Sequence, residues 1–388
     1  MDKLIRITTI PLSLEKLLGD QLKYMRGYYA VTAVSSNEPR LKQVGKKEGV
    51  PTYTVEMTRQ ITPIADLKAL WKLYNFLRKE KPLIVHSHTP KAGIVGMMAA
   101  KLAGVPIRLH TVAGLPLMEV TGNRRKLLNL VEKLTYSCAT NVYPNSHGLK
   151  EIILNEDFCR ASKLKVIANG SSNGINTSYF SSVNFQLEEL GQLKASLSIV
   201  EFDTVFVFVG RLVSDKGVNE LISSFKNLNK KHPQTKLLLV GPLEEELDPL
   251  DLETLTEIDN NDNIISLGYQ TDVRPYFAIS DALAFPSYRE GFPNVVMQAG
   301  AMGLPSIVSN INGCNEIIVE GENGIIIPPK DSDALYHAML KFVEDKDLLS
   351  KLKANARRMI VERYEQQVVW DALLAEYKRL EENVQKRN

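Results

Sequence analysis

Short apolar runs alternate with amphipathic segments through the first half of the chain. The runs have the length and the β-branched and aromatic content of buried strands, and the segments between them have a helical period. The predicted strands are residues 4–10, 29–36, 50–57, 83–89, 106–112, 141–146 and 163–170, and the predicted helices include 14–25, 64–80, 91–104 and 124–139. Repeated strand–helix units predict a mostly parallel, doubly wound α/β sheet.

A segment rich in Ser, Asn and Gly interrupts this pattern at about residues 171–200, and a second series of the same kind follows. Its predicted strands are 205–212, 236–242, 263–269, 282–287, 305–310 and 324–329, and long charged helices, 331–348 and about 350–386, end the chain. A chain of 388 residues is too long for one ordinary core. We therefore predict two doubly wound Rossmann-like domains, residues 1–180 and 181–367, that face a cleft.

The composition favours a globular protein without a targeting or membrane-spanning segment. No apolar run reaches the about 18 residues that a membrane-spanning helix needs. The N-terminal residues lead directly into a predicted strand and lack the apolar segment of a signal peptide. The cysteines, Cys138, Cys159 and Cys314, are few and widely spaced. They argue against a disulfide framework or a zinc site and indicate a reducing cytoplasm.

The net charge of +2 hides a division between the two halves. Residues 1–180 contain 26 Lys and Arg against 13 Asp and Glu, and the remaining residues contain 21 against 32. A basic first half suggests an anionic partner, which could be nucleic acid, an anionic membrane or a phosphorylated substrate. Chance variation on a solvated surface is the alternative.

Residues 114–136 combine apolar positions with Arg124, Arg125, Lys126 and Lys133. Such a segment could enter a membrane surface and attract anionic lipid. An ordinary amphipathic core helix is the alternative. Nucleic acid is not expected as a partner, because the basic residues are not interleaved with stacking aromatic residues.

Residues 281–303 contain a predicted strand, a polar turn at Glu290–Gly291 and a predicted helix that has Pro293 in its first turn. A helix N-terminus suits a phosphate, whereas the Glu290 carboxylate repels phosphate and accepts hydrogen bonds from hydroxyls. A site that binds an anion beside a polyol is typical of a sugar-nucleotide site. An ordinary surface turn with an incidental glutamate is the alternative.

Residues 210–217, "GRLVSDKG", place Arg211 just after a predicted strand and Lys216 just before a predicted helix. Two cations beside a helix N-terminus can hold a diphosphate. The alternative is a solvated loop with two surface cations. The G-x4-G-K-[ST] spacing of a P-loop is absent, and no clean G-x-G-x-x-G follows a strand, which disfavours a nicotinamide enzyme.

Other polar residues also follow predicted strands, where doubly wound sheets bind ligands. In the first half they are His88 with Lys91, His110 and Asn145. His86, His88 and His110 lack nearby carboxylates that would complete a metal site, and a buried, hydrogen-bonded histidine is the alternative for each. His110, which precedes a flexible stretch, is the better candidate to act on a substrate or orient it.

The motifs of the second half resemble those of the retaining GT-B glycosyltransferases of family 4, the glycosyl transferases group 1. They are, in order, "GRLVSDKG", "LVG", "LGY", "PSYREGFPNVVMQAGAMGLPSIVS", "NGCNEII" and "NGIIIPP". The first half fits more loosely through "IVHSHTPKAGIVGMMAAKLAGVPIRLHTVAG" and "YPNS", which look like enzymes that build polyprenyl-diphosphate-linked bacterial glycans. The resemblance implies that the C-terminal helix, about residues 368–388, packs back on the first domain.

The resemblance implies a role for each matching position. Arg211 and Lys216 would hold the donor diphosphate and stabilise it as it leaves. Glu290 would bind hydroxyls of the donor sugar, and His110 would lie against that sugar at the reaction centre. The other donor-binding positions are Gly210, Gly268, Tyr269, Gly291, Phe292, Asn294, Val295 and Gln298, and His88, Lys91 and Asn145 lie on the acceptor side.

The sequence departs from the family pattern at two places. Gln298 stands where the family usually has a second glutamate, whose usual partner is the ribose diol. A neutral amide can still bond both hydroxyls but loses charge assistance of about 1 kcal/mol. The usual glycine-rich loop after the first strand is also missing, since residues 8–20 read "TTIPLSLEKLLGD".

We therefore expect a retaining glycosyltransferase that needs neither metal nor cofactor. Its expected donor is a UDP-hexose or UDP-N-acetylhexosamine, and its expected acceptor is a polyprenyl-diphosphate-linked sugar in capsule, O-antigen or exopolysaccharide synthesis. The expected location is peripheral, on the inner face of the cytoplasmic membrane. A UDP-N-acetylglucosamine 2-epimerase-like enzyme and a non-catalytic sugar-nucleotide-binding subunit are the alternatives.

Overall fold

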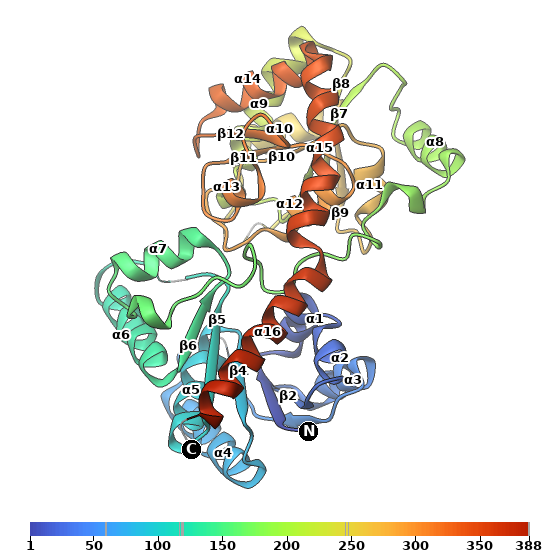
Figure 1. Ribbon diagram of the computed structural model, residues 1–388. Helices are drawn as coiled ribbons and strands as arrows, with labels where there is room; N and C mark the ends of the chain where they lie inside the picture. The colour runs from blue at the N-terminus through green and yellow to red at the C-terminus, as the bar shows by residue number, and fades with distance from the viewer. Residues whose placement is uncertain (59, 116, 118–119, 245, 247, 387–388) are drawn as a thin grey trace. The chain divides into compact units, whose positions relative to one another are not determined.

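The computed structural model describes residues 1–58, 60–115, 117, 120–244, 246 and 248–386 (Figure 1). The chain divides into two compact units: unit 1 comprises Met1–Gly174 and Gln367–Asn388, and unit 2 comprises Ile175–Gln366. Each unit is built on one six-stranded sheet. The prediction of an α/β chain with two doubly wound parallel sheets is confirmed.

The sheet of unit 1 has the strand order β3-β2-β1-β4-β5-β6, with parallel pairing throughout. Its strands are β1 Lys3–Ile7, β2 Ala30–Ser35, β3 Thr52–Thr54, β4 Ile84–Ser87, β5 Ile107–Val112 and β6 Asn141–Pro144. Its helices are α1 Pro11–Leu18, α2 Gln21–Met25, α3 Glu38–Glu48, α4 Pro63–Glu80, α5 Pro90–Leu102, α6 Gly122–Cys138, α7 His147–Asn155 and most of α16 Gln366–Gln385.

Alternate residues of β1 enter different core clusters, because successive side chains of a strand point to opposite faces of the sheet. Ile5 and Ile7 pack with residues of α4, α5 and α6. Leu4 packs with residues of α1, α2, α3 and α16. Arg6 lies on the same face as Leu4 and is fully buried there. This face of the sheet therefore buries one charged side chain beside the apolar cluster that contains Leu4.

The predicted strand at 163–170 is wrong. Only Leu164 forms a bridge, with Val142, and a 3₁₀ turn precedes it at Ala161–Lys163. Ala168 and Gly170 have φ values of 48° and 98°. Left-handed backbone cannot continue a strand, so the chain leaves the sheet despite its apolar pattern.

Two predicted helices are each divided into two. Asp20 has a φ of 60° and separates α1 from α2 within the predicted helix at 14–25. The long predicted helix at 350–386 breaks at Glu365, whose ψ of 138° is extended, between α15 Lys346–Tyr364 and α16. Gly19, with a ψ of 131°, is also outside the helical region, so two residues interrupt the first apolar pattern and one interrupts the second.

The sheet of unit 2 has the strand order β12-β11-β10-β7-β8-β9, again with parallel pairing. Its strands are β7 Thr204–Val209, β8 Thr235–Val240, β9 Ile264–Gly268, β10 Ala282–Phe285, β11 Ser306–Ser309 and β12 Gly324–Ile327. Its helices are α8 Leu187–Ser196, α9 Val218–Lys231, α10 Leu252–Asn260, α11 Arg274–Ala278, α12 Asn294–Ala301, α13 Cys314–Ile317, α14 Ser332–Glu344 and α15.

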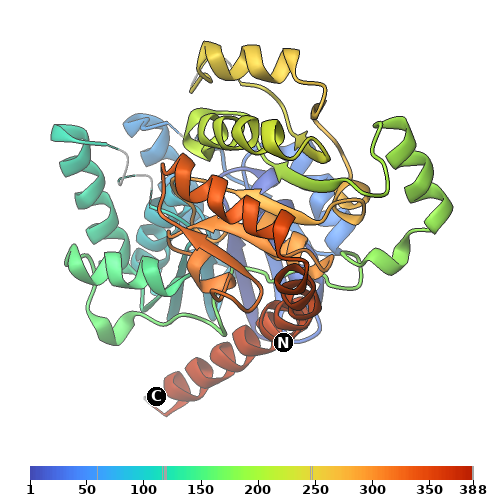
Figure 2. The same ribbon diagram turned by 90° about the horizontal axis from the view of Figure 1, so that it is seen from above.

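Helices cover both faces of this second sheet (Figure 2). α9 packs against α10 and α14, whereas α12 packs against α15. The central strands β7 and β8 are buried on both faces, which explains their near-continuous apolar sequences. Within the described parts of both units, no helix combines the length and apolar character needed to cross a membrane.

Candidate functional site

The loops that follow β7 and β10 meet in unit 2, because these two strands pair side by side. From β7 the chain continues outward through β8 and β9, and from β10 it continues in the opposite direction through β11 and β12. Ligands of doubly wound sheets bind at such a reversal, beyond the carboxyl ends of the strands. The two stretches selected from the sequence, 210–217 and 286–294, therefore lie together at the position where a ligand is expected.

The backbone holds these two loops against each other. Gly217 begins α9 with a φ of 71°, and a Cβ at this position would lie 2.1 Å from the carbonyl oxygen of Pro286. Glycine alone combines this conformation with so close an approach. On the other side of the contact, the N–H of Tyr288 donates to the carbonyl oxygen of Asp215 at 2.9 Å. The loops therefore form one continuous structure.

Lys216 and Glu290 form an ion pair where the two loops meet. Lys216 Nζ donates to Glu290 Oε1 at 2.5 Å, and Ser287 Oγ donates to the same oxygen at 3.1 Å. The two ion-paired side chains are 19% and 16% exposed. An ammonium group attracts phosphate, and a carboxylate accepts hydrogen bonds from hydroxyls. The structure therefore brings the predicted phosphate-binding and sugar-binding groups into direct contact.

The other charged side chains of the two loops are also paired. Arg211, just after Gly210, is half exposed and pairs with Glu244, whose hydrogen bond raises the pKa of the guanidinium. Arg289 pairs with Asp215 at 2.6 Å. Sequence reasoning selected Arg211 but missed Asp215 and Arg289. The available signal was that each motif places opposite charges side by side, Asp215 before Lys216 and Arg289 before Glu290.

The start of α12 lies directly after Glu290 and Gly291. Pro293 has φ −75° and ψ 111° and precedes the first helical residue, so α12 begins one residue later than predicted. Among the residues that the structure describes, no side chain caps its first turn, which contains Asn294 and Val295. Uncapped N–H groups at a helix start suit an anion.

Phe292 and Gln298 have different environments on either side of this helix start. The Phe292 ring is buried and packs edge-on against Tyr364, with 5.4 Å between ring centroids, so only its backbone is suited to the predicted role. Gln298 is partly exposed and lies four residues after Asn294. Residues at this spacing share one helix face, which keeps Gln298 on the side of Asn294.

Asn312 stabilises the turn at Glu290–Gly291, and sequence reasoning did not select this residue. Its side-chain amide donates to the carbonyl oxygens of Glu290 and Gly291, the latter at 3.2 Å. The neighbouring Gly313 has a φ of 77°, and a Cβ there would lie 2.6 Å from the Gly291 carbonyl oxygen. The Asn-Gly pair after a predicted strand was the signal, because this dipeptide favours tight turns.

Gly268 ends β9, and Tyr269 follows it at the same edge of the sheet. The Gly268 carbonyl oxygen accepts a hydrogen bond from the N–H of Gly241 at 2.8 Å. Gly241 lies so close to Gly210 that a Cβ would be 1.7 Å from the Gly210 carbonyl oxygen. Tyr269 is 71% exposed. Through Gly241, backbone contacts therefore connect two of the predicted donor-binding positions, Gly210 and Gly268, whereas the ring of Tyr269 lies in solvent.

His110 lies on β5 in unit 1 and is almost fully buried. Its Nδ1 and the Ser87 hydroxyl are 2.8 Å apart. Its ring lies over Gly93 of α5, where a Cβ would be 2.6 Å from His110 Cε1. Burial lowers the pKa of His110 to about 4, so the imidazole is neutral near pH 7. The predicted role against a sugar therefore corresponds to a neutral hydrogen-bonding group.

Arg6 anchors a buried polar cluster on the other side of β4. Arg6 donates through Nε to His88 Nε2 at 3.1 Å, through one terminal nitrogen to the Tyr377 hydroxyl and through the other to Gln21 Oε1. His86 has a partner on each ring nitrogen, the Tyr377 and Thr111 hydroxyls, at 2.6 and 2.8 Å. A guanidinium can only donate, so His88 Nε2 is unprotonated and Nδ1 carries the proton.

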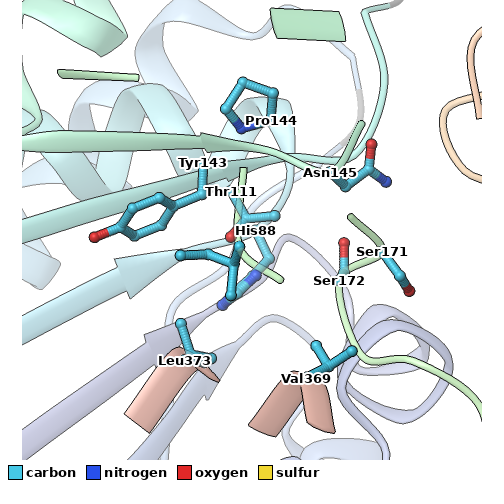
Figure 3. Close-up of a pocket in the computed structure, with 10 residues that line it drawn as sticks. His88, Thr111, Tyr143, Pro144, Asn145, Ser171, Ser172, Val369 and Leu373 are labelled. Carbon is cyan, nitrogen blue, oxygen red and sulfur yellow. The ribbon is translucent and has the colours of Figure 1, made fainter. Parts of the chain in front are cut away.

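A small cavity of about 20 Å³ lies beside His88, at the carboxyl ends of β4, β5 and β6 (Figure 3). His88 Nδ1, Asn145 Oδ1 and Ser172 Oγ are buried without a hydrogen-bond partner among the described residues. All three residues line this cavity. The volume is sufficient for one oxygen-sized group, which could bond to several of these atoms. Two of the three predicted acceptor-side residues, His88 and Asn145, are thus brought together.

Lys91, the third predicted acceptor-side residue, lies elsewhere. Its ammonium group pairs with Asp66 of α4, and its side chain is only 10% exposed. It does not line the cavity beside His88. Across the residues that the structure describes, no group of three or more His, Cys, Asp or Glu side chains could hold a metal ion.

Family models and known relatives agree with this architecture. A model described as "Glycosyl transferases group 1" matches residues 191–359, and one described as "Glycosyl transferase 4-like domain" matches residues 23–170. The capsular polysaccharide biosynthesis glycosyltransferase CapM of Staphylococcus aureus is 34% identical over 97% of this chain and 96% of its own length. The UDP-Gal:alpha-D-GlcNAc-diphosphoundecaprenol alpha-1,3-galactosyltransferase of Escherichia coli is 33% identical over 80% of this chain and 78% of its own.

Solved structures agree on the fold. The crystal structure of Anabaena Alr3699/HepE in complex with UDP superposes with a TM-score of 0.80 at 19% identity, covering 98% of this chain and all of its own. The sucrose-phosphate synthase of Thermosynechococcus elongatus has a TM-score of 0.76 at 19% identity, covering 98% of this chain and 99% of its own. The chain therefore belongs to the glycosyl transferases group 1 and is a glycosyltransferase of the GT-B fold.

Proposed function

We propose that this enzyme transfers a sugar from a UDP-sugar to a polyprenyl-diphosphate-linked acceptor, with retention of the anomeric configuration, in capsule or related polysaccharide synthesis. The observation that carries the proposal is the contact of Lys216 with Glu290 beside the uncapped start of α12. A nucleotide-sugar presents a diphosphate directly next to a polyol, and this arrangement matches both parts. The names of the Escherichia coli and Staphylococcus aureus relatives support the donor, acceptor and pathway classes.

In this proposal unit 2 binds the donor. Lys216, Arg211 and the first-turn N–H groups of α12 hold the diphosphate, and Glu290 accepts hydrogen bonds from the sugar hydroxyls. Gln298 is proposed to bind the ribose, and Gly268 and Tyr269 are proposed as further donor-binding residues. The cations and N–H groups of the protein, fixed in this way, stabilise negative charge as it develops on the leaving phosphate.

The proposed reaction takes place on one face of the sugar. The bond between the anomeric carbon and the phosphate oxygen breaks, and its electron pair stays on that oxygen. The acceptor hydroxyl oxygen bonds to the same carbon from the same face, and its proton passes to the departing phosphate oxygen. Lys216 and Arg211 stabilise the UDP that forms, and neutral His110 of unit 1 positions the donor sugar. No metal ion is assigned to these steps.

Unit 1 is proposed to bind the acceptor. The cavity beside His88 and Asn145 lies at the carboxyl edge of its sheet, where doubly wound sheets bind ligands. Because the acceptor is attached to a lipid, the enzyme is expected at the inner face of the cytoplasmic membrane. The basic charge of residues 1–180 supports that location.

The test is to incubate the enzyme with UDP-hexoses and UDP-N-acetylhexosamines in the presence of GlcNAc-diphospho-undecaprenol in detergent. Mass spectrometry should show addition of one sugar, and the anomeric proton coupling of the product should match that of the donor. Inverted product would contradict the mechanism. Conversion of UDP-N-acetylglucosamine without acceptor would instead indicate an epimerase, and donor binding without turnover on any acceptor would indicate a non-catalytic subunit.

A further inference from the structure

Two helices of unit 1 carry matching rows of exposed apolar side chains. Ile64, Leu67 and Trp71 on α4 follow the spacing i, i+3, i+7, and Leu127, Leu130 and Leu134 on α6 follow the same spacing. Each of the six is between 41% and 77% exposed. Residues at this spacing form one stripe along a helix. We refer to these six residues as the α4–α6 surface.

Helix α5 joins the two rows. It packs against both α4 and α6 (Figure 1), and its partly exposed positions Ile94 and Met98 are also apolar. Isolated exposed apolar residues are ordinary, whereas a contiguous patch of them marks a binding surface. Ile94 and Met98 pack partly on the core, so the apolar character of this face comes chiefly from the two rows on the helices that flank α5.

The exposed charged residues beside the two rows are basic, although Glu38 of α3 lies near one of them, Lys72. Exposed lysines flank both rows, Lys68 and Lys72 on α4, and Lys126 and Lys133 on α6. The carboxylates of the three helices are not available to oppose them. Asp66 pairs with Lys91, Glu80 pairs with Lys3, and Glu132 is buried. A partner of this face must therefore accept apolar side chains and carry negative charge beside them.

The chain enters this face from the carboxyl edge of the sheet. α4 and α6 follow β3 and β5 respectively, and the segments 55–62 and 113–121 lead from the carboxyl ends of these strands to the first helical turns. Ile64, Leu67 and Leu127 belong to the first two turns of their helices. An acceptor that reaches this edge from a lipid would pass these side chains.

We propose that the α4–α6 surface lies on an anionic lipid bilayer, with its six apolar side chains in the interface and its lysines at the headgroups. The inference rests on the proposed lipid-linked acceptor and adds the contact that would hold the enzyme beside it. Apolar rows flanked by lysines are typical of helices that lie in a membrane interface, and tryptophan favours that depth. The sequence indicated only the α6 segment, and the structure adds α4.

Sedimentation of the full-length protein with vesicles tests this surface without donor or acceptor. The wild type should sediment with phosphatidylcholine vesicles that contain phosphatidylglycerol, and less with phosphatidylcholine alone or in high salt. The double variant Leu67→Glu/Leu130→Glu should bind about tenfold or more weakly, since both positions are exposed and the charges oppose the lipid. Leu187→Glu, at an 88% exposed position of α8, is the matched control and should bind as the wild type does.

Fluorescence gives a second readout. The chain has two tryptophans, Trp71 and Trp370, and Trp370 already donates to Asn173 Oδ1 at 2.7 Å. Anionic vesicles should shift the emission of the wild type to shorter wavelength, and Trp71→Phe should lose that shift while it still sediments.

Three results would overturn the inference: no sedimentation of the wild type, unchanged sedimentation of the double variant, or a self-association that the double variant abolishes in the absence of lipid. Transfer in detergent is measured separately. Vesicle binding without any transfer would contradict the proposed function alone, and transfer without vesicle binding would contradict this inference alone.

Discussion

Lys216 Nζ and Glu290 Oε1 are 2.5 Å apart, although 74 residues separate them in the sequence. The pair joins the loop after β7 to the loop after β10, and each partner comes from a motif with a different expected ligand. The ammonium group is expected on the diphosphate and the carboxylate on the sugar. Binding and turnover should therefore respond differently when each partner is changed.

Lys216→Ala should lower turnover by about ten- to a hundred-fold or more, because one charge-assisted contact to the leaving phosphate is lost. Glu290→Gln keeps the shape of the side chain and should weaken donor binding as well as turnover. Steady-state kinetics with the donor varied would measure both effects. The control is Lys226→Ala, which removes a lysine of α9 that pairs with Glu257 of α10, outside the two loops. Undiminished turnover in Lys216→Ala would contradict the diphosphate assignment.

Gln298→Glu should tighten donor binding by about three- to tenfold, since a carboxylate adds charge assistance to a hydroxyl contact worth about 1 kcal/mol. The KM for the UDP-sugar and the Kd for UDP would show this change, while the maximal rate changes little. An unchanged Kd for UDP would mean that position 298 does not face the ribose.

Gly217→Ala should destabilise unit 2 by about 1–3 kcal/mol or more, because the residue has a φ of 71° and its Cβ would meet Pro286 O at 2.1 Å. Gly191→Ala is the matched control. It lies in α8, no atom lies within 4 Å of its Cβ position, and alanine should stabilise it slightly. Urea unfolding monitored by circular dichroism would compare the two. Equal stability in both variants would contradict the close contact between the loops.

His110 should make unit 1 less stable as the pH falls. Its folded pKa of about 4 lies below its ordinary value of 6.5, so the unfolded chain binds a proton first. The contribution of neutral His110 to the free energy of unfolding is complete above pH 6.5 and is lost as the pH falls toward 4. About 2 kcal/mol of this free energy is lost by pH 5. Urea unfolding at pH 7 and pH 5 should show a smaller loss for His110→Asn than for the wild type. An equal loss in both proteins would mean that His110 titrates normally.

His88→Gln and His88→Asn should differ in stability, because Arg6 donates to Nε2 of the native ring. Glutamine can place its carbonyl oxygen near that position, whereas asparagine is too short and leaves one guanidinium N–H without an acceptor. An unsatisfied buried donor costs about 1–3 kcal/mol, so His88→Asn should be the less stable variant. Nitrogen-15 NMR of the wild type should show the proton on Nδ1, and a proton on Nε2 would contradict the assignment.

Most strands and the two-sheet organisation followed from the apolar pattern. Parallel strands are buried on both faces, and β7 and β8 therefore give nearly unbroken apolar runs. The same reasoning gave a false strand at 163–170, because a local pattern does not show that Ala168 and Gly170 have left-handed backbones. Residue type and spacing located the loops between strands, but they did not show that the chain leaves the sheet at residues 163–170.

The site could be predicted only in part. Motifs gave Lys216 and Glu290 separately, and the pairing of β7 with β10 explains why they meet. The sequence drew attention to His86 and His88 but not to their partner Arg6, whose contact with Tyr377 spans 371 residues. Asn312, which bonds to the Glu290 and Gly291 carbonyls, looked like an ordinary turn residue. Contacts between distant segments depend on the completed sheet.

The neighbouring positions of β7 and β10 also affect how the protein reaches its native state. Two complete strands, β8 and β9, and several helices lie between them in the sequence, so the chain closes a long loop before they pair. Such non-local pairings form late and slowly in folding. The hydrogen bond from Tyr288 N–H to Asp215 O exists only after that closure. A newly made chain would therefore bring the two loops together late in folding, and a partly folded unit 2 would lack the proposed donor site.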